Sequence, residues 1–268
     1  MSFFDMHTHT FFSFDGRQTP MTLCRDAADH GLLGVTVTDH YDFFASGVHN
    51  YYDYFYKERR ARIGQMRHIW AGALKVRYGI ELGQPQCDMA GYRRVMARED
   101  FDAVIGSIHN LNDGTSIYDK EYRDYSDCAA VLEEYFSMMR EMVESCDIDI
   151  LGHIDYPLRV MDSAFEGRTD LSDMKQLIIP ILKVCAEKGI AIEINTAGMR
   201  KWLGVPGPAP WVLREYKRLG GKYISFGSDS HRGGDCAYGF AEAAALAREG
   251  GFDSAVWFDG RRHVAVSL

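Results

Sequence analysis

The sequence predicts an α/β protein whose parallel strands close into a barrel. Strand-like apolar runs alternate with helical stretches along the 268 residues, which is the pattern of successive β/α units. Residues capable of chemistry follow all seven strand-like runs. An open doubly wound sheet is the structural alternative, but it would concentrate its site at one switch point, so this distribution favours the barrel.

The predicted elements follow one another at short intervals. The strand-like runs are apolar or β-branched and lie at residues 3–6, 34–38, 74–80, 103–108, 148–151, 190–194 and 223–226. The helical stretches lie at residues 20–30, 51–70, 125–145, 171–188, 211–219 and 239–249. Thr19 and Pro20 mark the start of the first helix, as N-cap and first helical residue. In the second helix, the charges from Lys57 to Arg62 are expected on a solvated face.

Composition narrows the classes of partner. Lys and Arg total 30 against 38 Asp and Glu, a net charge of -8, which is the wrong sign for a duplex-DNA binder. The six cysteines are widely spaced without a Cys-x-x-Cys pair, as in a reduced, cytoplasmic protein. No uncharged apolar stretch reaches about 18 residues, so no membrane span is expected. Without a linker or repeat, residues 1–268 are expected to form one domain; the oligomeric state is left open.

Histidines and carboxylates recur where the predicted strands end. Because side chains alternate along a strand, His7 and His9 are expected to point to the same side, close enough to hold one ion. The same period places Asp229 and His231 on one side of their segment. The intervening strand ends carry, in chain order, His40, Glu81, His109, His153 and Glu193.

So many polar groups at one end of a core require partners. A buried carboxylate or imidazole without a partner costs several kcal/mol, and metal ligation removes that cost. Imidazole and carboxylate ligands without thiolate suit Zn, Mn or Fe. Glu193 is expected to be structural, forming hydrogen bonds around the site. Four further histidines lie off the pattern and are expected not to bind metal: His30, His49, His68 and His263.

The ordered motifs are His7-Thr8-His9-Thr10, Thr38-Asp39-His40, Glu81, His109, His153 and Gly227-Ser228-Asp229-Ser230-His231. Together they resemble the polymerase-and-histidinol-phosphatase (PHP) superfamily, and most of all its monofunctional histidinol-phosphatase branch. The likeness covers nearly the whole chain. It implies a distorted, seven-stranded, TIM-like (β/α)7 barrel that holds three divalent metal ions, of Zn, Mn or Fe.

The resemblance also implies which residues hold each ion. The first set is His7, His9, Glu81 and Asp229. The second set is Glu81, His109 and His153, so that Glu81 bridges two ions. The third set is Asp15, His40 and His231, although some relatives have histidine at the position of Asp15.

The implied reaction is hydrolysis of a small phosphate ester by a metal-bound hydroxide. Asp229 is the candidate for assisting the attacking water, and His40 or His231 for helping the leaving alkoxide. Arg159 and Arg200 follow two strand ends. In the family, arginines at these motifs hold the substrate phosphate, which a planar guanidinium can bind through two hydrogen bonds.

The substrate implied by the resemblance is L-histidinol phosphate, an intermediate of histidine biosynthesis. Three alternatives remain open. A PHP phosphoesterase could act on another small ester, such as a nucleoside phosphate. An amidohydrolase-type deaminase also combines His-x-His with a closing aspartate, but it often bridges its metals with a modified lysine, and no lysine ends an inner strand here. A non-catalytic metal-binding module is the third.

Overall fold

The computed structural model describes residues 3–43, 50–165 and 170–268. Its main sheet contains β1 (Phe4–Thr8), β2 (Gly34–Val37), β3 (His40–Asp42), β4 (Lys75–Gly83), β5 (Ala103–Ser107), β6 (Ile150–Leu151), β7 (Ala191–Asn195) and β8 (Ile224–Gly227). Within the described ranges, seven of these strands follow the order β1-β2-β4-β5-β6-β7-β8, each parallel to its neighbour. The short strand β3 pairs with the C-terminal part of β4.

The sheet closes where β1 meets the segment that follows β8. The backbone N–H of Asp229 donates to the carbonyl of His7 at 2.8 Å, and the N–H of His9 donates to the carbonyl of Ser230 at 2.8 Å. These two bonds join the first and last strands of the path. The predicted seven-stranded α/β barrel is therefore confirmed, and its seam lies among the predicted metal ligands.

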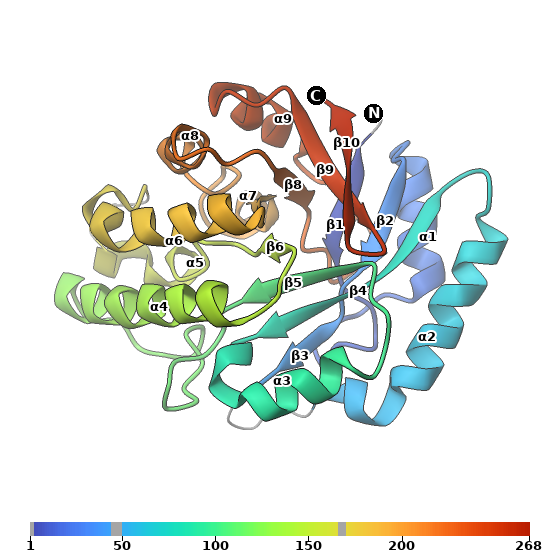
Figure 1. Ribbon diagram of the computed structural model, residues 1–268, viewed down its shortest axis with the longest axis horizontal. Coiled ribbons are helices and arrows are strands. Elements are labelled where there is room, and N and C mark those ends of the chain that lie inside the picture. The colour runs from blue at the N-terminus through green and yellow to red at the C-terminus, as the bar shows by residue number, and fades with distance from the viewer. Residues whose placement is uncertain (1–2, 44–49, 166–169) are drawn as a thin grey trace.

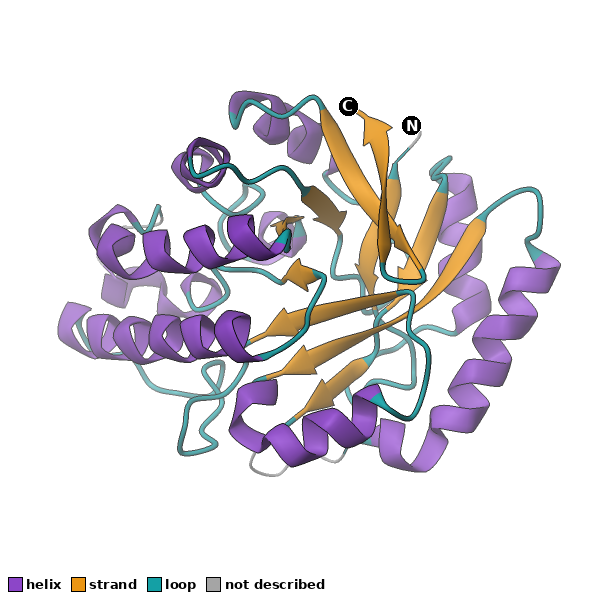
Figure 2. Ribbon diagram, in the orientation of Figure 1, coloured by secondary structure: helices purple, strands orange, loops and turns teal. Residues whose placement is uncertain are grey.

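Helices lie outside the strands (Figures 1 and 2). They are α1 (Pro20–Asp29), α2 (Tyr51–Ile69), α3 (Met89–Met96), α4 (Tyr125–Ser145), α5 (Leu158–Met161), α6 (Lys175–Lys188), α7 (Ala197–Lys201), α8 (Pro210–Arg218) and α9 (Phe240–Glu249). Three 3-10 turns are η1 (Pro85–Asp88), η2 (Asp162–Phe165) and η3 (Ser172–Met174). None of the helices in the described ranges combines the length and apolarity needed to cross a bilayer.

The six predicted helices are present, with shifted boundaries in places. Thr19 caps α1 as predicted, because its hydroxyl accepts the N–H of Thr22 at 3.0 Å. The helix predicted from residue 171 begins at Lys175 instead. Leu171 has a left-handed backbone, with φ 56°, and the turn η3 follows it. The short helices α3, α5 and α7 and the strand β3 were not predicted.

A β-bulge in β1 controls which side chains face the barrel interior. The register between β1 and β2 shifts between Asp5 and Thr8. Within this stretch, Met6 belongs to the core cluster that contains Ile105 and accepts a hydrogen bond from the Thr36 hydroxyl at 3.3 Å. The next residue, His7, nevertheless reaches the Glu81 carboxylate, and His9 reaches that of Asp229. A bulge can re-aim side chains in this way. The N-terminal part of β1 therefore supplies core residues, and its C-terminal end supplies the polar residues of the site.

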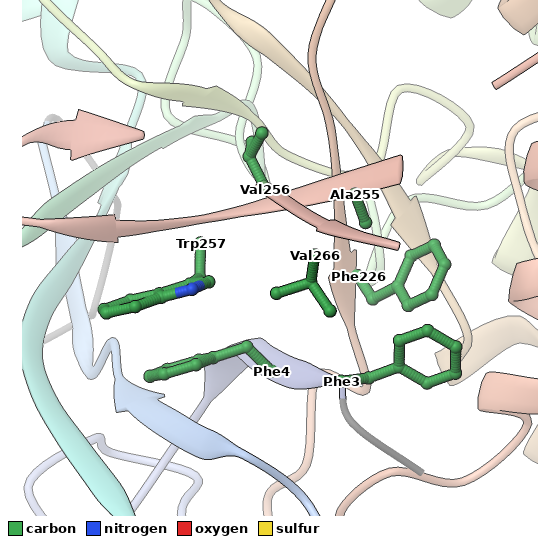
Figure 3. Close-up of a pocket in the computed structure, with 7 residues that line it drawn as sticks. All are labelled: Phe3, Phe4, Phe226, Ala255, Val256, Trp257 and Val266. Atoms are coloured by element: carbon green, nitrogen blue, oxygen red, sulfur yellow. The ribbon is translucent and has the colours of Figure 1, made fainter. Parts of the chain in front are cut away.

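A hairpin that follows α9 covers the end of the barrel at which the parallel strands begin. Its strands, β9 (Ser254–Asp259) and β10 (Arg262–Ser267), pair antiparallel, and β9 packs beside β1 and β8 (Figure 1). The ring of Trp257 stacks on that of Phe4, with centroids 4.8 Å apart. These two residues help to line a small apolar cavity with Phe3, Phe226, Ala255, Val256 and Val266 (Figure 3). The hairpin thus completes the core at the end away from the polar cluster.

Candidate metal centre

All nine predicted metal ligands converge at the C-terminal end of the barrel. They come from strand ends and from the loops that follow, which parallel β/α units bring together at one face. The distances between imidazole nitrogens and carboxylate oxygens of these residues begin at 2.8 Å, between His40 Nδ1 and Glu81 Oε2. They extend to 3.9 Å, between His7 Nε2 and Asp229 Oδ1. The structure therefore places the predicted residues in one cluster.

Glu81, at the end of β4, lies at the middle of the cluster. Its Oε1 is 3.2 Å from His109 Nε2 and 3.0 Å from His153 Nε2. Its Oε2 is 3.2 Å from His7 Nε2. Burial alone would raise the pKa of this carboxyl, but the neighbouring His7, His40 and His109 hold it well below its usual range. The group is therefore a carboxylate that faces several imidazoles at once.

Several inward-facing atoms are buried and have no hydrogen-bond partner among the described residues. They are Nε2 of His7, Nε2 of His9, Nδ1 of His40 and Oε2 of Glu81, of which the last two lie 2.8 Å apart without the angles of a hydrogen bond. Unsatisfied buried polar atoms are rare because each is costly. Ligand atoms of His7, His9 and Glu81 lie within 4.8 Å of one another, as do those of Glu81, His109 and His153. The donor set and its unpaired atoms fit divalent metal binding.

The third predicted set also assembles, and it gains a neighbour. The Asp15 carboxylate lies 3.0 Å from His231 Nε2 and 3.7 Å from His40 Nε2. Atoms of His9, His40 and His231 form a further group within 4.8 Å. Burial, with His231 and His40 nearby, lowers the pKa of His9 to about 3. His9 is therefore neutral at pH 7, the form in which imidazole binds a metal.

Protein groups behind the cluster orient its histidines. Glu193 Oε1 lies 2.7 Å from His7 Nδ1, and its Oε2 accepts the backbone N–H of His153 at 2.6 Å. The Ser13 hydroxyl lies 3.2 Å from His9 Nδ1. Contacts of this kind fix the tautomer and leave Nε2 free for a metal. The predicted structural role of Glu193 is confirmed.

Asp42 is a member of the cluster that sequence reasoning missed. Its carboxylate lies 2.7 Å from His109 Nδ1 and 3.8 Å from His40 Nδ1. It was missed because residues 40–42 were not recognised as a strand. The alternation of a strand would have placed Asp42 on the same side as His40, and this His-x-Asp spacing was the available signal.

Arg59 corrects the prediction of a fully solvated face on the second helix. Its side chain is 1% exposed, and its Nε donates to Asp39 Oδ2 at 2.7 Å. Asp39 in turn accepts the N–H of Thr10 at 2.6 Å and the hydroxyl of Ser13 at 3.1 Å. Arg59 and Asp39 thus form a buried ion pair, and each charge is balanced by the other, since an unpaired buried charge would be costly. Through Asp39 the pair also fixes the loop after His9.

Both predicted phosphate-binding arginines reach the segment around Asp229. Arg159 is buried and donates to Asp229 Oδ2 at 2.9 Å and to Asn195 Oδ1 at 2.8 Å. Its guanidinium also lies 5.4 Å from the ring centroid of Trp202. Arg200 donates to the carbonyls of Ser228 at 2.7 Å and Asp229 at 3.0 Å. The two cations therefore border the cluster on one side.

The backbone conformation of Asp229, and not the alternation of a regular strand, directs its side chain into the cluster. It lies beyond the end of β8 and has φ 52°, in the left-handed region, a conformation that strains a non-glycine residue and often marks a functional site. The segment is therefore not a regular strand, although Asp229 and His231 lie on the same side of it, as predicted. Asp229 Oδ1 lies 3.4 Å from His9 Nε2 and 3.5 Å from His231 Nδ1.

Three of the histidines predicted not to bind metal lie outside the cluster. His30 Nδ1 contacts the carbonyl of Asp26 at 2.8 Å, and His68 is on the exposed face of α2. The ring of His263 packs on Tyr223, with centroids 4.0 Å apart. The fourth, His49, lies outside the described residues.

Comparisons with known proteins all find similarity to the PHP family or to histidinol-phosphatases. A model of the PHP domain family matches residues 5–197. The chain is 29% identical over 252 residues to the probable histidinol-phosphatase of Clostridium acetobutylicum, covering 91% of this chain and 92% of that one. It is 26% identical over 274 residues to the histidinol-phosphatase of Lactococcus lactis subsp. lactis, covering 96% and 95%.

Solved structures share the fold. The crystal structure of histidinol phosphate phosphatase from Lactococcus lactis, complexed with zinc, L-histidinol and phosphate, aligns with a TM-score of 0.79. Its sequence identity is 25%, and the alignment covers 98% of this chain and 99% of that one. The putative histidinol phosphatase from Listeria monocytogenes aligns with a TM-score of 0.77 at 17% identity, covering 89% and 98%.

Proposed function

Because the chain belongs to the PHP domain family, we propose that it is a metal-dependent phosphatase that hydrolyses L-histidinol phosphate to L-histidinol and phosphate. The observation that carries the proposal is the cluster of histidines around Glu81, with two arginines at its edge. The Lactococcus lactis relative, whose solved complex contains zinc, L-histidinol and phosphate, supports this substrate. The enzyme would act in histidine biosynthesis.

Three divalent ions, of Zn, Mn or Fe, are the proposed cofactors. His7, His9, Glu81 and Asp229 would hold the first ion. Glu81, His109 and His153 would hold the second. Asp15, His40 and His231 would hold the third. Bound there, such ions supply a water of lowered pKa and charge that neutralises the phosphoryl oxygens.

The arginines are proposed to bind the substrate phosphate. Arg159 donates from Nη1 and Nη2 to protein acceptors, but a guanidinium carries five N–H donors. The remaining donors can reach a phosphoryl oxygen that approaches Asp229. Arg200 braces the backbone at Ser228 and Asp229 and adds positive charge on the same side. Both residues would thus orient the ester relative to the carboxylate.

The proton transfers are assigned to residues at the open side of the cluster. Burial would raise the pKa of Asp229, but His7, His9 and Arg159 hold it well below its usual range, so it can accept a hydrogen bond from the attacking water. His231 and His40 approach each other at 3.4 Å between their Nε2 atoms. Of the two, His231 has the more exposed side chain, 23% against 8%. Either could direct a proton toward the leaving alkoxide.

The setting of the enzyme follows from the same features. All six cysteines are free thiols, which suits a reducing compartment, and we place the enzyme in the cytoplasm. The net charge of -8 argues against a nucleic-acid partner. We propose that residues 1–268 act as a single catalytic domain on a small phosphate ester.

The test is phosphate release by the purified protein from L-histidinol phosphate. A chelator-stripped sample and a nucleoside monophosphate serve as controls. The expected result is metal-restored turnover with strong preference for L-histidinol phosphate. Faster release from the nucleotide would replace the substrate and keep the metal chemistry. No release from either ester by metal-loaded protein would refute the phosphatase.

A further inference from the structure

Asp42 is a buried carboxylate that none of the three proposed ion sets includes. Its Oδ1 lies 2.7 Å from His109 Nδ1. Its Oδ2 is buried, has no hydrogen-bond partner among the described residues, and lies 3.8 Å from His40 Nδ1. One carboxylate therefore faces two histidines that belong to different proposed ion sets.

The backbone around Asp42 is held in place from both sides. Its N–H donates to Asn50 Oδ1 at 2.8 Å, and its carbonyl accepts from Asn50 Nδ2 at 2.9 Å. On the other side β3 pairs with β4, which places Asp42 beside Gly83. This anchoring fixes the direction in which the carboxylate points.

Gly83 provides the space in which the carboxylate meets the imidazole. A β-carbon at this position would clash with the Asp42 carboxylate and would lie 3.0 Å from His109 Nδ1. The backbone of Gly83 does not need a glycine conformation, since it continues the regular strand β4. The absence of a side chain there is therefore explained by the contact between Asp42 and His109.

The hydrogen bond determines which nitrogen of His109 is available. An ionised carboxylate only accepts, so Nδ1 of His109 must carry the proton. In the neutral imidazole that binds a metal, the lone pair is then on Nε2, which lies 3.2 Å from Glu81 Oε1 and 3.4 Å from His153 Nε2. An acceptor behind a histidine fixes both tautomer and ring orientation.

We infer that Asp42 is a positioning residue that presents His109 Nε2 to the second ion and adds negative charge beside His40. The inference rests on the proposed metal centre. Direct ligation by Asp42 is the competing interpretation, because atoms of His40, Asp42 and His109 also lie within 4.8 Å of one another. The hydrogen-bond distance to Nδ1, on the side of the ring away from Glu81, favours positioning.

The experiment measures zinc affinity by chelator competition and zinc content by elemental analysis, without substrate. Asp42→Ala removes the acceptor. Gly83→Ala displaces it while the charge stays in the protein. Asp42→Asn keeps one acceptor oxygen. Gly91→Ala is the matched control, because a β-carbon there would also clash with an aspartate, Asp88, which caps α3.

The expected loss is about 10- to 100-fold in affinity at one zinc site for Asp42→Ala and Gly83→Ala. Asp42→Asn should fall between these variants and the wild type, because its amide oxygen can still accept from His109. Zinc content at saturation should stay at the wild-type value in all variants. Gly91→Ala should bind zinc like the wild type.

Two results would overturn the inference. One is wild-type zinc affinity in both Asp42→Ala and Gly83→Ala. The other is loss of one zinc equivalent from Asp42→Asn at saturation, which would mean direct ligation. Circular dichroism and thermal unfolding of the metal-free variants separate a loss of folding from a loss of affinity, and the near-isosteric Asp42→Asn keeps the test decisive. A protein with this zinc dependence but no phosphatase activity would refute the proposed function alone.

Discussion

Four histidines of the cluster share one arrangement at the scale of single residues. Each places Nδ1 against a protein oxygen, which leaves Nε2 directed at the other members of the cluster. The pairs are His7 with Glu193, His9 with Ser13, His109 with Asp42 and His231 with the carbonyl of Asp229. The ligand atoms are therefore oriented before any ion arrives.

Zinc binding to the metal-free protein is predicted to release protons at pH 7.5. Burial opposes protonation, but Glu81 and Asp15 raise the pKa of His40 to about 9, and Asp42 and Glu81 raise that of His109 to about 10. Both imidazoles must become neutral to bind zinc, so affinity should increase with pH up to that range. Titration calorimetry in buffers of different ionisation enthalpy measures the protons. A heat that is the same in every buffer would contradict the prediction.

The same raised pKa values affect folding of the metal-free protein. Each protonated histidine stabilises the folded state fully below its ordinary pKa of about 6.5. This contribution is lost as pH rises through about 9 for His40 and about 10 for His109. The metal-free protein should therefore become less stable between pH 7 and pH 10.

The predictability of single residues depended on their place in the pattern. Glu81 and His153 could be identified because each interrupts or follows an apolar run at a strand end. Asp42 was missed because residues 40–42 were not recognised as a strand, although the His-x-Asp spacing was available. Ser13 could not be identified, because its role depends on which imidazole the fold brings beside it. Arg59 was placed in solvent because a charged helical run does not reveal which member turns toward a buried carboxylate.

Among the elements, the β9–β10 hairpin contributes buried residues to the core at the end of the barrel away from the cluster. Its turn contains Gly260 and Arg261, with φ 56° and 63°, the left-handed pair that a type I′ turn requires. The signal was present in the sequence, since Asp259-Gly260 lies between two β-rich runs, but the hairpin was not predicted. Its packing against the barrel end depends on contacts between distant segments.

Trp257→Ala is predicted to lower the free energy of unfolding by about 3 to 5 kcal/mol. Trp257 is 5% exposed and stacks on Phe4, so truncation would leave a cavity at the closed end. Chemical denaturation measures the loss. Val264→Ala, at a 39% exposed site on β10, is the control and should change stability by less than about 0.5 kcal/mol. Zinc content should be unaffected, and its loss would contradict the separation of the two barrel ends.

At the scale of the whole molecule, the alternation of strands and helices was sufficient to predict the barrel. It was not sufficient to predict how the barrel closes. The seam requires the backbone of His7 to meet that of Asp229, a pairing between the two ends of the path that local patterns do not encode. The bulge in β1 was likewise invisible, since it depends on the register with β2.

Metal removal is predicted to destabilise the whole barrel. The ligands come from β1, β3 and β4 and from loops after several strands, so ions held among them would join distant segments. Zinc at about 100 times its dissociation constant should add about 2.7 kcal/mol. Calorimetric scans with chelator and then with excess zinc measure the change. Equal unfolding temperatures in both conditions would contradict ion binding across the barrel.

The seam between β1 and the segment after β8 also has a consequence for synthesis on the ribosome. His7 emerges before strands β2 to β8, whereas Asp229 and His231 emerge only after all the other barrel strands. A nascent chain therefore cannot present the complete set of ligands until every strand of the barrel has been translated. All metal sites can therefore be filled only after the last barrel strand has been synthesised and the barrel has closed.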